Sequence, residues 1–467
     1  MIRFPSLRSF AAGALLLAGA LTAHAAEIRL PDYTTQTLDN GATVLLMPRR
    51  DVPLVSATVL VRGGALADAP GKEGTAALLG ELLSKGAGAR DAQAFAEAID
   101  NAGGSIDFGS SSEALYANAR FLSKDAGLML SLLGDALLRP KLDPAEFDKV
   151  RKRAIDGIGA SKDSDPRALM GTYADAWLFR GHPYGRPADG DETSLAAIAL
   201  ADVQAFRTQQ MGGDRLIVAI AGDFDPAAVA AQVEKTFGGW ARATGALPQV
   251  AAKPRESGRR VLLVDKPRAT QTYFSLANVG SVHGDPAEAA QDIVQTVFGG
   301  RFTSMLMTEL RVKSGLSYGA NASLDRPRQP GATSVQSYTK TESTKAAIDL
   351  AIATLDRLHA DGLDAAAIDS SKRYIAGQFA PRLETAPQLA AKLADLSLYG
   401  DDNDAVDGYL GRIEAATPEQ VAAARAVFPA SADLVITAIG DASKIREVMK
   451  GYGPLTEMKI GDPRFAP

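Results

Sequence analysis

Leu216-Ile-Val-Ala-Ile-Ala-Gly-Asp223 is an apolar run that ends in a turn, and Leu434-Val-Ile-Thr-Ala-Ile-Gly-Asp441 repeats it later in the chain. Each run is typical of a buried strand, and a helical pattern follows each Gly-Asp pair. The two Gly-Asp pairs lie 441 − 223 = 218 residues apart, and Tyr184-Gly185 and Tyr399-Gly400 lie 215 apart. Two pairs of segments at nearly one offset predict an internal duplication. Chance similarity is the alternative, because β-α junctions resemble one another.

The stretch from Ala241 to Arg260 separates the two copies. It contains prolines, glycines, alanines and basic residues without sustained periodicity, which is typical of a linker. We therefore predict an N-terminal domain over 27–240, a linker over 241–260 and a C-terminal domain over 261–455. Strand and helix patterns do not alternate strictly within each half. The fold class expected is α+β, with two homologous halves, each a mixed or antiparallel sheet packed with helices.

The composition excludes several classes of function. Of 467 residues, 46% are hydrophobic and 22% charged, which is globular composition. A net charge of −5 argues against a nucleic-acid partner, which usually meets a basic surplus. The absence of cysteine excludes disulfides, thiolate zinc sites and cysteine nucleophiles. Only four histidines are present, which restricts metal chemistry further.

The N-terminus has the pattern of an export signal. Arg3 and Arg8 precede a short apolar run, Ala11 to Leu21, and Ala23-His24-Ala25 offers a small-x-small cleavage site. The run is shorter than the roughly 20 residues that span a bilayer. We predict a signal peptide over 1–25, a periplasmic location and no membrane span in the mature chain. An uncleaved anchor is the alternative.

Several motifs occur in an order that resembles the insulinase-like zinc peptidases, family M16. The resemblance runs from about Leu38 to about Gly451 and implies the M16/LuxS-like metallohydrolase fold in each half. The motifs that carry it are Leu60-Val-Arg-Gly-Gly64, Pro70-Gly-Lys-Glu-Gly74 with the helical pattern up to Gly86, Gly181-His-Pro-Tyr-Gly-Arg186, Ile220-Ala-Gly-Asp223, Gly299-Gly-Arg-Phe-Thr-Ser304, Glu309-Leu-Arg311 and Gly315-Leu-Ser-Tyr318.

The resemblance also locates a metal site that this chain has lost. Active members carry H-x-x-E-H on the first helix, where two histidines hold zinc and the glutamate activates water. Those three positions fall at Ala77, Gly80 and Glu81, and the downstream glutamate ligand falls near Gly157, beside Asp156. Zinc sites usually need three protein ligands, including imidazole or thiolate. We therefore expect no metal and no other cofactor in this chain.

The mature chain retains three histidines, and none has a partner at metal-ligand spacing. His182 lies in a Pro-Tyr-Gly turn, and we expect it to be structural. We expect His283 to lie in a solvated turn. We expect His359 to lie at the C-terminal end of a helix, where the helix dipole favours a positive charge.

A second pair of residues carries a functional expectation. Arg311 and Tyr318 are 318 − 311 = 7 residues apart. Inactive M16 subunits keep an arginine and a tyrosine at this spacing, and the resemblance implies that they hold substrate against the partner's zinc site. A guanidinium suits a peptide carbonyl or carboxylate, and a tyrosine hydroxyl can donate to a developing oxyanion. Ordinary packing of both residues is the alternative.

The function expected is that of a non-catalytic, substrate-binding subunit of a heterodimeric M16-type zinc endopeptidase. A catalytic H-x-x-E-H subunit would supply the zinc, and unfolded peptides would be the substrates. The first alternative is a structural or assembly protein with an M16 fold and no role in proteolysis. The second is a peptidase that is active on its own through an unrecognised site, which the missing histidines disfavour.

Overall fold

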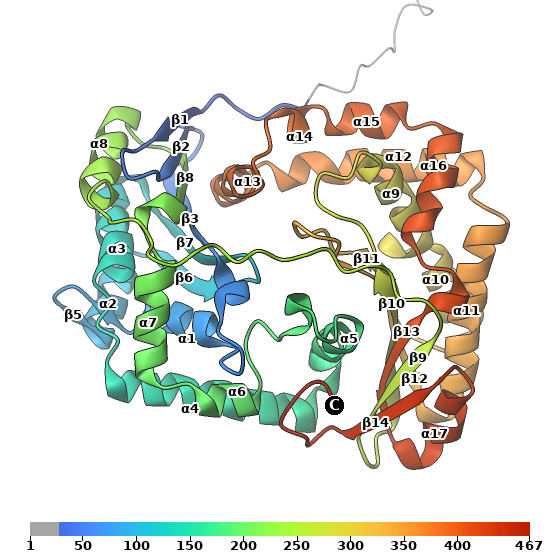
Figure 1. Cartoon of the computed structure of the whole chain (residues 1–467). Coiled ribbons are helices and arrows are strands. Elements are labelled where there is room, and N and C mark those ends of the chain that lie inside the picture. Colours follow the sequence, from blue (N-terminus) through green and yellow to red (C-terminus); the bar gives the residue numbers. More distant parts are fainter. Residues whose placement is uncertain (1–27) are drawn as a thin grey trace, which may run out of the picture.

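The computed structural model describes residues 28–467, so the expected signal peptide lies outside the described residues. Two halves lie side by side, each built on a six-stranded sheet with helices packed against it (Figure 1). This confirms the α+β class and the two-half organisation expected from the sequence. Among residues 28–467, no helix is both long enough and apolar enough to cross a membrane.

The first sheet has the strand order β1-β2-β8-β3-β7-β6. Its pairs are antiparallel except β2 with β8. The strands are β1 (Thr34–Thr37), β2 (Thr43–Pro48), β3 (Leu54–Arg62), β6 (Ser105–Ser110), β7 (Ala114–Leu122) and β8 (Leu216–Gly222), and a separate small hairpin joins β4 (Gly86–Ala87) to β5 (Arg90–Asp91).

The second sheet has the order β11-β12-β10-β13-β9-β14. Five strands of this sheet, taken in the order β9-β13-β10-β12-β11, correspond one by one to β2-β8-β3-β7-β6 of the first sheet. The two apolar runs that repeat in the sequence form β8 and β13, which are equivalent strands. The outermost strands differ, because β1 is antiparallel to β2 whereas β14 is parallel to β9. The strands are β9 (Arg260–Asp265), β10 (Gln271–Val279), β11 (Ala320–Leu324), β12 (Ala332–Lys340), β13 (Val435–Gly440) and β14 (Leu455–Lys459).

Helices cover the outer face of each sheet (Figure 1). In the first half they include α8, which spans the stretch predicted from the sequence. In the second half, α9 ends at Gln295 and continues as a π-helical turn over Thr296–Gly300. The helices are α1 (Thr75–Leu82), α2 (Ala92–Asp100), α3 (Ala126–Leu138), α4 (Pro144–Ser164), α6 (Glu192–Ala197), α7 (Leu200–Gln210), α8 (Pro226–Phe237), α9 (Glu288–Gln295), α10 (Met305–Met307), α11 (Thr344–Ala360), α12 (Ala365–Phe379), α15 (Tyr409–Ala415), α16 (Pro418–Ala424) and α17 (Ala442–Lys450). The short helix α14 (Asp404–Asp407) belongs instead to the apolar cluster around α13.

Two helices are exchanged between the halves. Helix α5 (Met170–Leu178) belongs to the first half in sequence but packs on the second sheet, where Tyr173 and Trp177 are buried against β9, β10 and β13. Helix α13 (Ala386–Tyr399) packs reciprocally on the first sheet (Figure 1). Burying one large apolar side chain contributes roughly 1.5–3 kcal/mol, so the exchange joins the halves into one body.

The exchange explains why the two repeated strands are apolar throughout. In β8, Val218 and Ile220 face the outer helices, whereas Ile217 and Ala219 face α13. All seven residues of β8 are buried, as are all six of β13. A strand covered on both faces has no polar side, so its sequence does not alternate.

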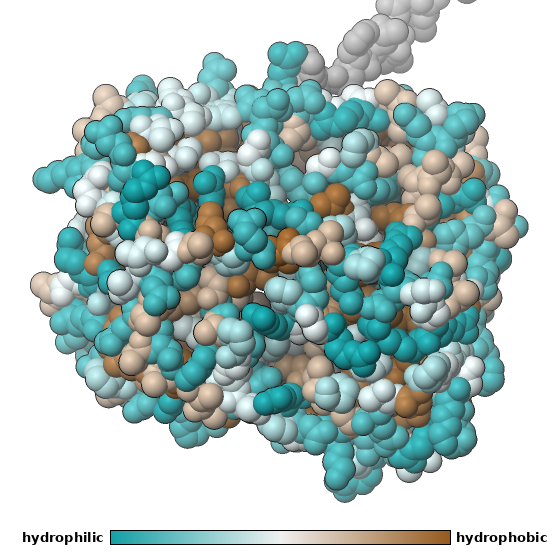
Figure 2. Space-filling view, in the orientation of Figure 1, coloured by the Kyte–Doolittle hydropathy of each residue, from teal (hydrophilic) through white to brown (hydrophobic). Residues whose placement is uncertain are grey.

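The linker crosses from one half to the other on the face drawn in Figure 1. It contains no helix or strand between residues 241 and 259. His182 Nε2 lies 2.8 Å from the carbonyl oxygen of Ala251, and the Arg215 guanidinium donates to the carbonyl of Gly245. Figure 2 shows apolar side chains near the middle of this face, where the surface is hollowed.

Candidate functional site

Helix α1 carries Ala77, Gly80 and Glu81, the positions that the resemblance assigns to the zinc motif of active family members. Asp68 caps its first turn, because its carboxylate accepts from the backbone N–H groups of Gly74 at 2.8 Å and Ala76 at 2.9 Å. Leu78 and Leu79 are buried in the core of the first half. The helix is therefore well formed without a metal.

The side chains at the expected metal positions do not form a donor set. Ala77 is half-buried and Glu81 is exposed at the end of α1, while Gly157 and Asp156 face solvent on α4. Asp156 pairs with Lys152. Among residues 28–467, no three His, Cys, Asp or Glu side chains are grouped so that they could hold a metal ion. One free carboxylate without imidazole does not fit zinc.

Close packing at Gly80 also leaves no room for the general base of active relatives. A Cβ atom at Gly80 would lie 2.8 Å from the Cα of Gly109 in β6. The second half shows the same arrangement, since a Cβ atom at Gly299 would lie 2.4 Å from the backbone nitrogen of Ala322 in β11. These glycines are 299 − 80 = 219 residues apart, so they occupy equivalent places in the repeat. The residues present fit neither zinc nor a base.

Arg311 and Tyr318, which are seven residues apart in the sequence, are in direct contact. The Arg311 Cζ lies 4.1 Å from the centre of the Tyr318 ring and 4.7 Å from the centre of the Phe302 ring. Both rings are largely exposed, Tyr318 at 72% and Phe302 at 60%. Stacking on aromatic faces orients a guanidinium and leaves its in-plane N–H donors available.

The N–H donors of the Arg311 guanidinium have no acceptor among the described residues. In the part of the chain that the structure describes, its guanidinium makes ring contacts but no hydrogen bond or ion pair. The nearest carboxylate on the same turn, Glu309, is already bound by Lys313 and Arg357, each at 3.0 Å. An arginine that is held by rings and free at its edge can bind an acceptor such as a peptide carbonyl.

Phe302 is a site residue that the sequence analysis missed. It lies in the quoted motif Gly299–Ser304, between the π-helical turn and Ser304, whose hydroxyl accepts from the Met307 backbone N–H at 3.3 Å. A second π-helical turn over Thr308–Lys313 then presents Arg311. An aromatic residue inside a glycine-rich turn is a weak signal on its own, because only the folded turn brings it to Arg311.

Two adjoining cavities of about 460 Å³ each lie between the halves, and together we call them the chamber. They share Glu113, Tyr184, Leu398 and Tyr399. The linker residues Leu247 to Val250 line the first cavity. Acidic side chains dominate the second, namely Glu113, Asp175, Asp325 and Asp395, with Arg326 as its basic residue.

Glu113 joins the halves at the chamber. Its carboxylate accepts from the backbone N–H of Arg328 in the second half at 3.2 Å. Burial and, to a lesser extent, the charge of Glu113 raise the pKa of Tyr184 to about 12. The same two causes raise the pKa of Tyr399 well above its usual range. Both phenols therefore stay protonated at neutral pH and remain hydrogen-bond donors.

Asp175 on α5 titrates abnormally. Its side chain is accessible from the chamber, yet many protein atoms surround it. This burial together with the charge of Asp325 raises its pKa to about 7. An unfolded aspartate has a pKa of about 3.9. As pH rises from about 4 to about 7, the unfolded state ionises first, so stability falls over this range.

Asp175→Asn is therefore expected to stabilise the protein at pH 8 and to have little effect near pH 4. Because water enters the chamber and screens the charge, we expect a gain of only about 1 kcal/mol at pH 8. Urea unfolding at both pH values measures it, with Asp51→Asn at the surface as a matched control. A gain that does not depend on pH would contradict this assignment.

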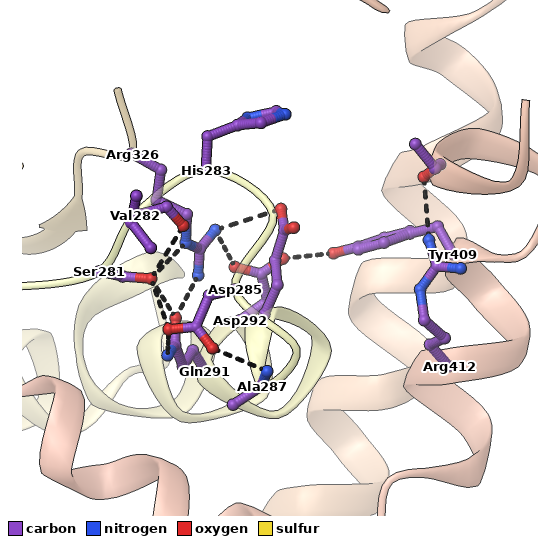
Figure 3. Close-up of polar contacts among 12 residues, drawn as sticks. Ser281, Val282, His283, Asp285, Ala287, Gln291, Asp292, Arg326, Tyr409 and Arg412 are labelled. Carbon is purple, nitrogen blue, oxygen red and sulfur yellow. Dashed lines mark hydrogen bonds and ion pairs between the residues drawn. The ribbon is translucent and has the colours of Figure 1, made fainter. Parts of the chain in front are cut away.

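A polar network holds the loop between β11 and β12 in the chamber wall (Figure 3). Arg326 Nη1 lies 2.8 Å from Asp292, and its other nitrogens donate to Gln291 at 3.2 Å and Ser281 at 3.3 Å. Tyr409 donates to Asp292 at 2.7 Å. The network ties this loop to α9 and α15, which indicates a structural role.

The three histidines contact protein groups. His283 is half-buried: its Nε2 lies 2.7 Å from Asp401, and its ring stacks on Tyr399 with centroids 3.9 Å apart. His283 lies in a turn, as expected, but the turn is only partly solvated, because Tyr399 at the end of α13 and Asp401 after it cover the ring. His182 contacts the linker, and His359, in the last turn of α11, lies 3.1 Å from the carbonyl of Pro429.

Family models match both halves of this fold. Residues 44–191 match the insulinase (peptidase family M16) model, and residues 197–375 match the peptidase M16 inactive domain. The duplicated fold and both matches are those of an M16 protein, and the second match is to the inactive-type domain. The chain belongs to peptidase family M16.

Relatives and solved structures agree with this assignment. An uncharacterized zinc protease of Mycobacterium tuberculosis is 27% identical over 390 residues, which are 82% of this chain and 88% of that protein. The beta subunit of the mitochondrial-processing peptidase of Blastocladiella emersonii is 26% identical over 257 residues, 55% of this chain and 54% of that protein. A peptidase M16 inactive domain from Pseudomonas fluorescens superposes with a TM-score of 0.81 at 23% identity, covering 88% of this chain and 98% of that one. A protease from Helicobacter pylori gives 0.80 at 20%, covering 88% and 100%.

Proposed function

We propose that this chain is the non-catalytic, substrate-binding subunit of a heterodimeric M16-type zinc endopeptidase that degrades or processes unfolded peptides in the periplasm. A catalytic H-x-x-E-H subunit would supply the zinc and the activated water. The observation that carries the proposal is Arg311, which stacks on two exposed rings and whose N–H donors have no partner within residues 28–467. A chain that served only as a scaffold would have no use for such an arrangement.

In this proposal, the chain binds the peptide substrate and orients it toward the zinc site of the catalytic subunit. The Arg311 fork would hold a carbonyl or carboxylate of the peptide in its plane, since its in-plane N–H donors are left available by the ring contacts. The Tyr318 hydroxyl would donate to the carbonyl oxygen as negative charge develops there. The altered α1 supports this division of labour, because Ala77 and Gly80 provide neither a metal ligand nor a base.

Reconstitution tests the proposal. The purified chain is mixed with the H-x-x-E-H protein of the same organism, and cleavage of a quenched fluorescent peptide is followed. We expect a stable complex that cleaves the peptide, whereas this chain alone does not. A complex whose rate does not depend on this chain would favour the scaffold alternative. Cleavage by this chain alone would contradict the proposal.

A further inference from the structure

A cavity of about 240 Å³ begins at the residue after Tyr318. It lies where the first half meets the inner face of the second sheet. Its lining residues are Arg167, Met170, Tyr273, Met307, Gly319, Ala320, Asn321, Gln336, Ser337 and Tyr338.

The floor of this cavity is polar. Asn321 on β11 pairs directly with Gln336 on β12, and Tyr273 on β10 pairs directly with Tyr338 on β12. Partners that lie directly opposite on neighbouring strands point to the same face of a sheet. Within residues 28–467, neither the Asn321 nor the Gln336 side-chain amide has a hydrogen-bond partner, so both are available to a ligand.

Arg167 provides the positive charge of this cavity. Its Cζ lies 4.9 Å from the centre of the Tyr338 ring. As with Arg311, no hydrogen bond or ion pair within the described part of the chain engages its guanidinium. Asp165 is near enough to act on Tyr273, whose pKa is raised by burial first and then by this charge, but it does not pair with Arg167. Arg167 is therefore stacked on Tyr338 and exposed, and its N–H donors have no acceptor within the described part of the chain.

We propose that this cavity is a subsite for an acidic side chain of the bound peptide. The inference rests on the proposed function, because it places the peptide main chain at Arg311 and Tyr318. A residue next to that main chain can reach a cavity that starts at Gly319. A carboxylate matches the in-plane donors of Arg167 and the amide donors of Asn321 and Gln336. A lysine side chain of the peptide would be repelled by the positive charge of the Arg167 guanidinium.

The test uses quenched fluorescent peptides that carry a single glutamate, moved along the peptide one position at a time, with glutamine and lysine counterparts. The reconstituted pair should prefer glutamate over glutamine by about tenfold in kcat/KM at one position, and lysine should be the poorest there. Arg167→Gln should abolish this preference while other positions stay unchanged. Arg50→Gln, an exposed arginine at the end of β2, is the matched control.

The outcomes separate the two proposals. If Arg311→Ala leaves cleavage unchanged, the proposed function fails. If Arg311→Ala lowers cleavage but Arg167→Gln leaves the glutamate preference intact, or if no position shows a preference, the subsite is refuted. Thermal unfolding of Arg167→Gln verifies that the variant folds, and partial recovery in Arg167→Lys would show that the charge carries the selectivity.

Discussion

Replacing Arg311 by alanine is expected to lower kcat/KM of the reconstituted pair about 100-fold, the loss typical of removing one donor aimed at developing charge. The guanidinium contacts both the Phe302 and the Tyr318 rings, so its loss removes the in-plane donors together with both ring contacts. Because Arg311 makes no hydrogen bond or ion pair within residues 28–467, the folded chain should be almost as stable without it.

Two further variants sharpen this test. Arg311→Lys keeps the charge but lacks the planar fork, so it should recover only a small part of the activity. Arg50→Ala should behave as the unaltered chain. Full activity of Arg311→Ala, with an unchanged melting temperature, would contradict the assigned role.

Rebuilding the metal motif is the second large effect that we expect. The triple variant Ala77→His, Gly80→Glu and Glu81→His should bind no stoichiometric zinc and should unfold more easily by about 2 kcal/mol or more. The reason is steric, because any Cβ atom at Gly80 would be 2.8 Å from the Cα of Gly109. Helix α1 cannot accept the glutamate unless it moves away from β6.

The double variant Ala77→His with Glu81→His is the matched control, since it keeps Gly80. It should fold nearly as well as the unaltered chain, because Ala77 is half-buried and Glu81 is exposed. Denaturant unfolding and metal analysis of both variants measure the difference. Stoichiometric zinc in the triple variant at unaltered stability would show that the packing at Gly80 is not the obstacle.

Local patterns predicted the framework well. The apolar runs at Leu216–Gly222 and Val435–Gly440 were expected to be buried strands, and they occupy equivalent places in the two sheets. Their offset revealed the duplication. The sequence also singled out Arg311 and Tyr318 as a pair, and the structure places the two side chains in contact. Their role in substrate binding stays a prediction.

Contacts between distant segments were beyond local patterns. The apolar sequence of α5 is the same whether the helix covers the first sheet or the second, so the exchange with α13 could not be read from it. The raised pKa of Asp175 depends on Asp325, which is 325 − 175 = 150 residues away in the sequence. The burial of His283 depends on Asp401, which is 401 − 283 = 118 residues away. Phe302 was missed for a different reason. It is only nine residues from Arg311, but the two π-helical turns, which no sequence pattern predicted, set the distance between them.

The metal content of the reconstituted complex tests the central claim most directly. Each subunit is purified, the pair is assembled, and zinc is quantified in the complex and in this chain alone. We predict one zinc ion per pair, lost when the H-x-x-E-H histidines of the other subunit are replaced, and no stoichiometric zinc in this chain. Tight zinc binding by this chain alone, or two zinc ions per pair, would contradict the account.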